Sequence, residues 1–454
     1  MTTAITIGMI IIYVAIMMGI GVYTARQTRS VSDFVLGSHS VGSWLTAFAY
    51  GTSYFSAVVF IGYAGQFGWT YGVSAAWVGV GNALLGSLLA WIVLGRRTRI
   101  MTQSLGAKTM PEYFEKRWNS KGLKIAAALI VFVFLIPYTA SVYNGLSRLF
   151  NMAFQIESEG AYKIIIIVMA LLTAIYVILG GYAATAINDF IQGIVMLIGI
   201  AAVVICAIQN QGGLTSALAA LGEIEVNGKT NTLNSVFGPD PLNLLGVVIL
   251  TSLGTWGLPQ MIHKFYAIKS ENDIKKGAVI STVFALIVAG GSYLLGGFDR
   301  LFCTLTEDGS GKTVISTLSN GKPDFDAMIP SLLHTALPDI LIGLVVVLVL
   351  SASMSTLSSL VLTSSSTLTI DLIKPNLKKC SDKKEMLIMR VLIAVFLIIS
   401  VLLAFNKNAS ISTLMSYSWG ALAGAFLGPF MYGLFSRKIT KPAVWTSFIL
   451  GIGL

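Results

Sequence analysis

A run of hydroxyl side chains follows one of the most apolar segments of this sequence. Residues 351–369 read SASMSTLSSLVLTSSSTLT, and 12 of these 19 side chains are Ser or Thr, directly after ILIGLVVVLVL at 340–350. Ala352, Ser355, Thr356 and Ser359 are spaced i, i+3, i+4 and i+7, so they share one face of a helix. Ser355, Ser358 and Ser359 define a second, overlapping face.

Hydroxyl and carbonyl oxygens on one helix face are hard ligands, and they favour a cation such as Na⁺ over a transition metal. The alternative explanation is structural, because Ser and Thr side chains also bond to their own helix backbone or permit close helix packing. Only a few of the twelve hydroxyls are therefore expected to bind a ligand, and the later run from Thr363 to Thr369 is expected to pack.

Asp189 is the clearest ionisable residue inside an apolar segment, GGYAATAINDFIQGIVMLIG at 180–199. It has two interpretations of about equal weight. An acid near the start of a helix is stabilised by the helix dipole and needs no function. A charged group at membrane depth, in contrast, is a functional residue by default.

The composition indicates the elements that must position these residues. Of 454 residues, 55% are hydrophobic and 11% are charged, whereas soluble domains have about 25% charged residues. Apolar segments long enough to cross a bilayer recur from end to end, which predicts an all-α polytopic membrane protein.

We expect about twelve transmembrane helices, at 4–24, 42–71, 73–95, 121–151, 161–180, 184–208, 241–268, 275–302, 334–371, 386–405, 409–436 and 440–454. The last is a partial span, so the chain is expected to end within a helix.

Basic residues follow five of the six odd-numbered predicted helices. They lie in the segments after the first, third, seventh, ninth and eleventh helices: Arg26 and Arg29; 95–121; Lys264, Lys269, Lys275 and Lys276; Lys374, Lys378, Lys379, Lys383 and Lys384; and Arg437, Lys438 and Lys441. Cytoplasmic loops are enriched in Lys and Arg, so we predict an N-terminus outside the cell and a location in the plasma (inner) membrane. The same pattern explains the net charge of +10 without a nucleic-acid partner.

The helix count is compatible with two repeats of five helices, at 42–208 and 241–436, plus an extra N-terminal helix at 4–24 and the partial helix at 440–454. Five is an odd number, so the repeats would have inverted orientations in the membrane. The first helix of each repeat is expected to be interrupted: residues 40–69 contain five glycines, and residues 244–265 contain Gly254, Gly257 and Pro259. Proline removes a helical hydrogen bond and frees a carbonyl group.

Five motifs together resemble the sodium/solute symporter family, which includes sodium/proline, sodium/pantothenate, sodium/sialic acid and sodium/glucose carriers. The motifs are FVLGSHSVGSW, SYFSAVVFIGYAG, GGYAATAINDFIQGIVMLIG, WGLPQMIHKFYAIKS and SMSTLSSLVLTSSSTLTIDL. The resemblance covers nearly the whole chain. It implies a LeuT-like fold, with two inverted five-helix repeats and an extra N-terminal helix, and Na⁺ as the coupling ion.

The resemblance also implies ligands, carried over motif by motif. The expected Na⁺ ligands are the carbonyl groups of Thr52, Phe55 and Ala352 and the hydroxyls of Ser355 and Thr356. Some family members hold a second Na⁺, and the matching residues here are Asp189, Ser355, Ser358 and Ser359. These residues are compatible with a second Na⁺ or with an aspartate that steers a single ion.

Residues expected to face the solute are Ser53, Ser56 and Val59 on the first interrupted helix and Ser252, Thr255 and Trp256 on the second. Proline carriers have Asp where this chain has Tyr54 and Gly where it has Ala57, and the local sequence is closer to the pantothenate carriers. No fixed Lys or Arg is evident in the helices around the cavity. A carboxylate solute would then be balanced by helix N-termini, hydroxyls or Na⁺.

We therefore expect a Na⁺-coupled symporter, a functional monomer in the lipid bilayer, that imports a small organic solute by alternating access. The solute would be pantothenate, an amino acid such as proline, or another small carboxylate. The scattered histidines and the lack of a Ser–His or Asp–Asp constellation argue against an enzyme. A solute sensor with the same fold and an H⁺-coupled symporter are the alternatives.

Overall fold

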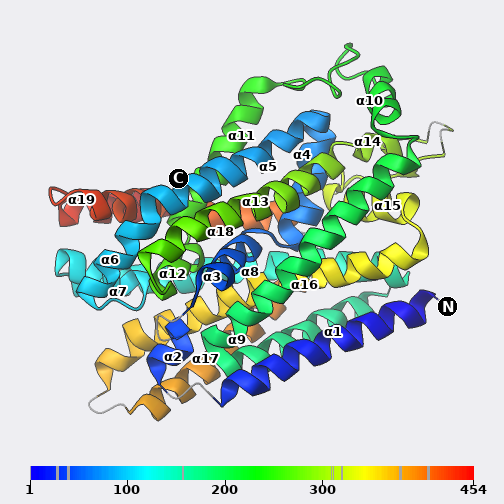
Figure 1. Ribbon diagram of the computed structural model, residues 1–454. Coiled ribbons are helices and arrows are strands. Elements are labelled where there is room, and N and C mark those ends of the chain that lie inside the picture. The colour runs from blue at the N-terminus through cyan, green and yellow to red at the C-terminus, as the bar shows by residue number, and fades with distance from the viewer. Residues whose placement is uncertain are drawn as a thin grey trace.

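The computed structural model describes residues 2–26, 30–37, 41–155, 158–307, 309, 311–318, 321–377, 381–405 and 410–453. Arg29, Lys378 and Lys379, three of the loop charges counted above, lie outside the described residues, as do residues 38–40 of the FVLGSHSVGSW motif. Figure 1 shows a bundle of long helices that run roughly side by side, with short helices at both ends. A small parallel pair of strands, β1 (Cys303–Thr304) and β2 (Thr313–Val314), lies in one connection.

The first half of the chain forms α1 (Thr2–Ala25), α2 (Val31–Leu36), α3 (Ser43–Tyr54), η2 (Val58–Tyr63), α4 (Ala64–Tyr71), η3 (Gly72–Ala75), α5 (Ala76–Gly81), η4 (Asn82–Leu89), η5 (Trp91–Gly95), α6 (Arg96–Leu105), α7 (Met110–Trp118), α8 (Lys121–Phe154), α9 (Glu159–Asn210) and α10 (Leu214–Glu223). The second half forms α11 (Pro241–Leu253), η6 (Gly254–Gly257), α12 (Pro259–Ala267), α13 (Glu271–Gly296), α14 (Asp299–Phe302), η7 (Phe325–Ala327), α15 (Met328–Ala336), α16 (Asp339–Thr367), η8 (Leu368–Ile373), η9 (Lys374–Asn376), α17 (Asp382–Ala404), α18 (Ile411–Phe435) and α19 (Lys441–Gly453).

Both predicted interruptions are present, and their backbones are similar. α3 ends at Tyr54, Phe55 is extended (φ −98°, ψ 121°), and helical structure resumes after Ser56. Leu258 is extended in the same way (φ −82°, ψ 120°) between η6 and α12, and the chain bends there by 53°. A helix end leaves carbonyl groups without intrahelical donors, so each break offers backbone oxygens inside the bundle.

Two glycines join consecutive helices without a loop. Helical residues run without a gap from Val58 to Leu105 (48 residues) and from Glu159 to Asn210 (52 residues), which at 1.5 Å per residue is about 70–80 Å of helix, more than twice the ~30 Å bilayer core. Gly72 (φ 61°, ψ −144°) and Gly181 (φ 55°, ψ −146°) interrupt these runs with backbone angles that glycine adopts readily. The predicted helices at 161–180 and 184–208 are therefore two arms of α9 that meet at Gly181.

Seven helices of the described residues are long and apolar enough to cross a membrane, and the bent pair formed by α11–η6 and α12 adds an eighth. The two runs described above are counted once each among the seven, although each covers two predicted spans or parts of them. Each of the twelve predicted segments is largely helical in the structure. The chain is thus a multi-pass membrane protein by length and composition.

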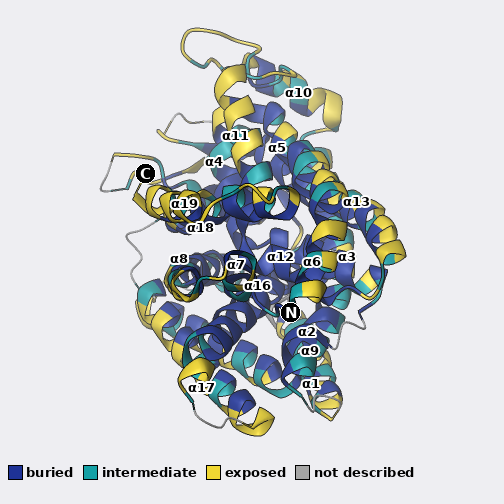
Figure 2. Cartoon of the chain, turned by 90° about the vertical axis from the view of Figure 1, so that its left-hand side faces the viewer, coloured by how far each residue is buried: buried dark blue, intermediate teal, exposed yellow. Residues whose placement is uncertain are grey.

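α16 lies at the centre of the bundle and packs against α1, α3, α8, α9 and α17. Its residues from Val345 to Thr367 are all buried, and Figure 2 shows its ribbon in dark blue among the other helices. Several hydroxyls outside the predicted ligand set bond to their own helix, including Ser353 to the Val349 carbonyl and Ser365 to the Leu362 carbonyl. The Ser353 and Ser365 hydroxyls are therefore hydrogen-bonded although they are buried.

The predicted helix at 334–371 begins later than expected, at Asp339. Pro338 is the cause, because a proline disfavours helical angles in the residue before it. Leu337 is accordingly extended (φ −104°, ψ 140°) and ends the separate helix α15.

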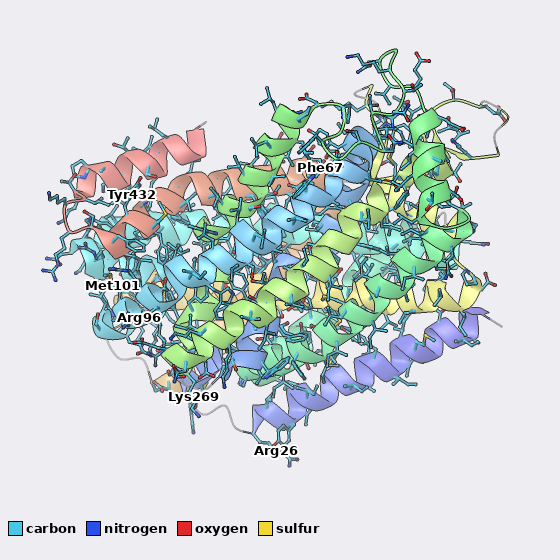
Figure 3. All side chains as sticks on the ribbon, turned by 45° about the horizontal axis from the view of Figure 1, so that its top comes forward. Arg26, Phe67, Arg96, Met101, Lys269 and Tyr432 are labelled. Carbon is cyan, nitrogen blue, oxygen red and sulfur yellow. The ribbon has the colours of Figure 1, made fainter. Side chains whose placement is uncertain are left out.

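Basic residues from different connections gather at one end of the bundle. Figure 3 shows Arg26, Arg96 and Lys269 at the same end. The Arg96 side chain lies 2.6 Å from Glu271, and Arg99 donates to the Lys269 carbonyl at 2.7 Å. The connections after the predicted third and seventh helices thus meet at this end.

A close contact between α5 and α13 gives a test of the packing. A Cβ atom on Gly79 would lie 2.4 Å from the Gly290 Cα, whereas a Cβ on Gly290 would meet no atom within 4 Å. Small residues allow membrane helices to approach closely, and overpacking typically costs about 1–3 kcal/mol. We expect Gly79→Ala to lower the melting temperature of the detergent-purified protein, with Gly290→Ala as the matched control. Equal melting temperatures for the two variants would contradict this packing.

Candidate cation and solute site

The five predicted Na⁺ ligands come together where the break after α3 meets α16. The Ser355 hydroxyl lies 3.1 Å from the Thr52 carbonyl oxygen and 3.0 Å from the Ala352 carbonyl oxygen. The Thr356 hydroxyl lies 3.5 Å from the Thr52 and Phe55 carbonyl oxygens and 3.1 Å from that of Ala352. All five residues are buried, so the oxygens form a group that is shielded from solvent.

The backbone explains why these carbonyl groups are available. The amide groups of Val59 and Phe60 both donate to the Ser56 carbonyl, so the Phe55 carbonyl has no helical donor. α3 ends at Tyr54, so the Thr52 carbonyl lies in its final turn, where carbonyls lack intrahelical partners. The Ser355 and Thr356 hydroxyls approach these two carbonyls from α16.

The spacing of the oxygens fits a hard cation. Ca²⁺, which is close to Na⁺ in size, binds oxygen ligands at about 2.4 Å, and two ligands at right angles around such an ion are then about 3.4 Å apart. The observed separations of 3.0–3.5 Å lie in this range. The donor set is entirely neutral oxygen, which suits an ion of low charge.

Asp189 and Lys264 form a buried ion pair beside this group. Lys264 Nζ lies 3.7 Å from Asp189 Oδ2, and the two side chains are 2% and 0% exposed. Lys264 Nζ also donates to the Ser359 hydroxyl at 2.9 Å, and Ser359 shares a 2.8 Å hydrogen bond with Ser53. A chain of polar contacts therefore runs from Asp189 to the break after α3.

The position of Lys264 corrects two expectations. Lys264 was counted among the loop charges after the seventh helix, and no fixed Lys was expected near the cavity. It lies instead on α12 and is buried, with 2% of its surface exposed. The sequence held a signal, because Lys264 falls inside the predicted span 241–268, and a basic residue at such depth needs an acidic partner.

The four residues matched to a second Na⁺ have different hydrogen-bond and ion-pair partners in the structure. Ser358 donates to the Ser355 carbonyl of its own helix, and the Ser355 hydroxyl points to the Thr52 carbonyl. Ser359 contacts Lys264 and Ser53. Among the described hydrogen bonds and ion pairs of Asp189, the partner is Lys264 and none of these serines.

The six predicted solute residues are all buried, and they divide into two groups. Ser53, Ser56 and Val59 lie on the first interrupted helix, and Ser53 reaches α16 through Ser359. On the second, Ser252 donates to Asn82 at 3.1 Å and the Trp256 indole donates to the Leu85 carbonyl at 3.1 Å.

The remaining contacts of this region tie the second group together and join the two interrupted helices. The Thr255 hydroxyl donates to the Ser252 carbonyl. Tyr54, next to Ser53, donates to the Thr251 carbonyl at 2.7 Å and thereby connects the two breaks.

Sequence reasoning missed several polar groups near these residues. Tyr138 and Trp419 are buried, their rings lie 6.1 Å apart, and the Tyr138 hydroxyl also faces Ser56 of the first break. Both polar atoms of the Gln260 amide, one residue after Pro259, are buried and have no hydrogen-bond partner among the described residues. Unsatisfied buried polar groups are costly and mark places where a ligand or water binds. Their signal in the sequence is weak, because single polar residues in apolar helices are common.

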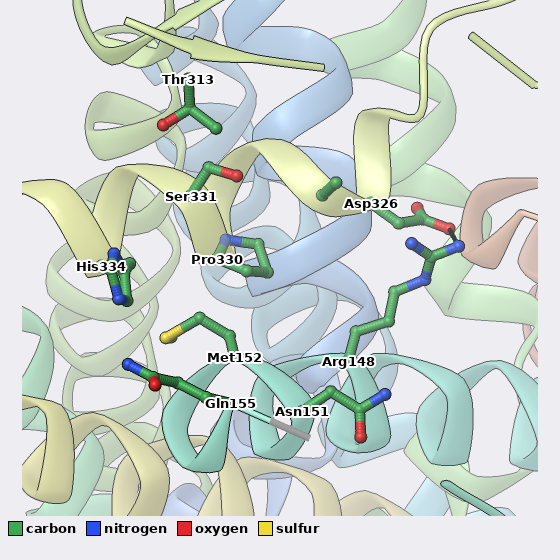
Figure 4. Close-up of a pocket in the computed structure, with 10 residues that line it drawn as sticks. Arg148, Asn151, Met152, Gln155, Thr313, Asp326, Pro330, Ser331 and His334 are labelled. Carbon is green, nitrogen blue, oxygen red and sulfur yellow. Dashed lines mark ion pairs between the residues drawn. The ribbon is translucent and has the colours of Figure 1, made fainter. Parts of the chain in front are cut away.

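A pocket of about 580 Å³ lies at the C-terminal end of α8, away from the basic end of the bundle. Figure 4 shows Arg148 pointing toward Asp326 across this pocket. Arg148 lies 2.8 Å from Asp324 and 3.7 Å from Asp326, and Asp326 also accepts from the Ile411 amide. Burial raises the pKa of Asp326, and the Arg148 charge opposes that shift.

Solved structures share this fold. A Na⁺-coupled sialic acid symporter, described in a substrate-bound outward-open state, superposes with a TM-score of 0.76 at 17% identity over 99% of this chain and 90% of that chain. Mhp1, a nucleobase-cation-symport-1 family transporter, gives a TM-score of 0.51 at 15% identity over 91% of this chain and 82% of that chain. The helical architecture is therefore the LeuT-like fold expected above.

Sequence comparison identifies the family. The profile of the sodium:solute symporter family matches residues 34–451. The sodium/proline symporter of Staphylococcus aureus is 30% identical over 453 residues, which is 98% of this chain and 83% of that protein, in strains JH9 and JH1 alike. The chain thus belongs to the sodium:solute symporter family, and it is a transporter that couples Na⁺ to the movement of a small organic solute.

Proposed function

We propose that the coupling Na⁺ binds among the oxygens of Thr52, Phe55, Ala352, Ser355 and Thr356. The observation that supports this most directly is the convergence of these oxygens from two separate helices at 3.0–3.5 Å. Hydroxyl groups at this spacing can donate to the carbonyls when no ion is bound. With Na⁺ bound, all five oxygens turn a lone pair to the ion.

The proposed ion joins two halves of the molecule. Thr52 and Phe55 belong to the proposed first repeat (42–208), and α16 belongs to the second (241–436). A cation between them stabilises the arrangement in which the break contacts α16. A ligand shifts a conformational equilibrium only by its difference in affinity between the two states. Separation of α16 from the break divides the ligands between two helices, so the separated state binds Na⁺ weakly and releases it.

The proposed solute site lies next to the ion on the same stretch of backbone. The Thr52 carbonyl would bind Na⁺, and the adjacent Ser53, with Ser56 and Val59, would face the solute. Ser252, Thr255 and Trp256 would contribute from the second break. Order imposed on the first break by Na⁺ would position Ser53 and Ser56, and this is the proposed physical basis of coupling.

We further propose a small carboxylate solute, of the class of proline or pantothenate. Support comes from the sodium/proline symporter relatives. The departures at Tyr54 and Ala57 from the proline carriers leave the choice between these solutes to experiment. The positive charge of Lys264 is already balanced by Asp189, so Na⁺ and the N-terminus of α12 would balance the carboxylate.

The proposed orientation has the N-terminus outside and the basic end of the bundle in the cytoplasm. The grouping of Arg26, Arg96 and Lys269 at one end supports it. The pocket beside Arg148 and Asp326 would then open to the outside. We also propose that the protein functions as a monomer in the plasma membrane.

The hydroxyls of the cation site can be tested directly. Ser355→Ala combined with Thr356→Ala removes two ligands, and hydrogen bonds to charged groups contribute about 1.5–3 kcal/mol each. We expect the apparent Na⁺ affinity of solute uptake in proteoliposomes to fall at least about tenfold, because 1.4 kcal/mol corresponds to a factor of ten.

The matched control for this variant is Ser353→Ala combined with Ser365→Ala on the same helix. Both side chains bond to their own helix backbone, so the Na⁺ dependence of uptake should be unchanged. An unaltered Na⁺ dependence in the Ser355→Ala/Thr356→Ala protein would exclude the proposed ligands. An H⁺ gradient imposed without Na⁺ should drive no uptake in the wild-type protein.

The solute class has its own test. Unlabelled proline and pantothenate are added in excess during Na⁺-driven uptake, together with proline amide and pantothenol, which lack the carboxylate. We expect one of the two acids to be transported and its neutral analogue to compete at least about tenfold more weakly, because a lost charge-assisted hydrogen bond costs about 1.4 kcal/mol or more. Equal competition by the neutral analogue would contradict a carboxylate solute.

A further inference from the structure

The Lys264 ammonium group occupies the place that a second cation would need. Asp189 is the only acidic side chain that the resemblance assigned to a second Na⁺, and its carboxylate faces Lys264 Nζ at 3.7 Å. Ser359, also assigned to that ion, accepts a hydrogen bond from the same nitrogen at 2.9 Å. The ammonium thus contacts two of the four residues that matched the second Na⁺.

The surroundings of Lys264 are those of a bound cation. The ring of Tyr182 lies below the ammonium group, with 5.3 Å between Nζ and the ring centroid, and aromatic faces attract cations at such distances. Lys264 is 2% exposed and Asp189 is 0% exposed. In the described residues, neither Asp189 oxygen accepts a hydrogen bond from another group, so Lys264 is the positive partner of this carboxylate.

A Na⁺ ion at the same place would exclude the lysine. An ion bound to Asp189 and Ser359 would lie about 2.4 Å from their oxygens, which is the space that Nζ fills. Two positive charges in contact, with one carboxylate between them and no solvent, repel each other strongly. The two cations are therefore alternatives at this position.

We propose that Lys264 is a built-in cation that replaces the second Na⁺, so that this symporter binds and couples a single Na⁺ per transport cycle. This inference rests on the proposed cation site at Thr52, Phe55, Ala352, Ser355 and Thr356, which takes the one exchangeable ion. Lys264 lies on α12, Asp189 on α9 and Ser359 on α16. The lysine performs the bridging role of an ion, but it stays covalently attached and crosses no gradient.

The test counts Na⁺ ions on the purified protein. Equilibrium binding of radioactive sodium at saturation should give one ion per wild-type protein. Lys264→Ala removes the fixed charge and frees Asp189 and Ser359, so it should bind two ions. Lys264→Ala combined with Asp189→Asn should return to one ion, and Lys264→Arg, which keeps the charge, should also bind one.

Uptake gives a second readout of the same change. The Hill coefficient for Na⁺ should be about 1 in the wild-type protein and rise toward 2 in Lys264→Ala, because it is limited by the number of coupled sites. Two bound ions in the wild-type protein would overturn the proposal. One ion in a folded Lys264→Ala protein would overturn it as well. If Lys264→Ala does not purify as a folded protein, Lys264→Gln takes its place. The number of Na⁺ ions bound to the wild-type protein tests the proposal in either case.

The binding assay separates this inference from the proposed function, because it needs no transported solute. Thr356→Ala removes a ligand of the first site alone, so it should lower the Na⁺ affinity of the otherwise wild-type protein at least about tenfold and leave one ion bound with unchanged affinity in the Lys264→Ala background. An unchanged affinity in the first of these proteins would reject the cation site itself. Weakened binding of every ion in both backgrounds would reject the replaced site while preserving the first.

Discussion

Carbonyl groups without a helical partner, held deep among apolar helices, dominate the centre of this molecule. A bilayer interior offers no water to such groups, so the protein must supply their partners. The break at Phe55 and Ser56 frees the Thr52 and Phe55 carbonyls, and the hydroxyls of α16 approach them. This requirement explains why α16 carries hydroxyl side chains while its entire central length is buried. The proposed Na⁺ would satisfy the same carbonyls more strongly, and the energy of the ion gradient would then act on the helix packing at this point.

Charge is distributed unevenly between the two polar regions beside α16. The proposed Na⁺ site contains neutral oxygens alone, whereas Asp189 and Lys264 form a neutral pair of full charges. Breaking a buried pair by removing one partner typically costs about 3–5 kcal/mol, so the pair also holds α9 against α12. Each Na⁺ that moves down a membrane potential of 100 mV contributes about 2.3 kcal/mol. For a solute without net charge, such as zwitterionic proline, a carrier with one mobile ion and one fixed cation therefore has half the electrical work that is available to a two-ion carrier.

Much of the fold could be predicted from the sequence, because apolar length, glycine and proline act locally. The interruptions near Phe55 and Leu258 followed from such residues, whereas the proposed Na⁺ ligands came from the family resemblance. The charge count failed at Lys264, since it registers a basic residue near a helix end without its depth. Local rules also could not show which hydroxyls of α16 contact other helices. Ser358 bonds to its own helix and Ser359 bonds to Lys264, and this difference depends on the helices that surround α16. Pro338 indicates that α16 starts at Asp339. The predicted helix at 334–371 was placed by its apolar composition instead, and so it began too early.

The glycine turns at Gly72 and Gly181 have a consequence for how this sequence can vary. Each joins two long helices through one residue, and a Cβ atom at Gly181 would lie 2.7 Å from the Phe34 carbonyl oxygen. Loops normally absorb insertions and deletions because their backbone is exposed and loosely packed. These two connections contain no flexible loop, so an added or deleted residue would rotate every side chain of the following helix by about 100° around the helix axis. Length changes between homologues should accumulate in the connections around 225–240 and 305–325 and avoid these turns, which also makes the turns unsuitable places for epitope tags or fused reporters.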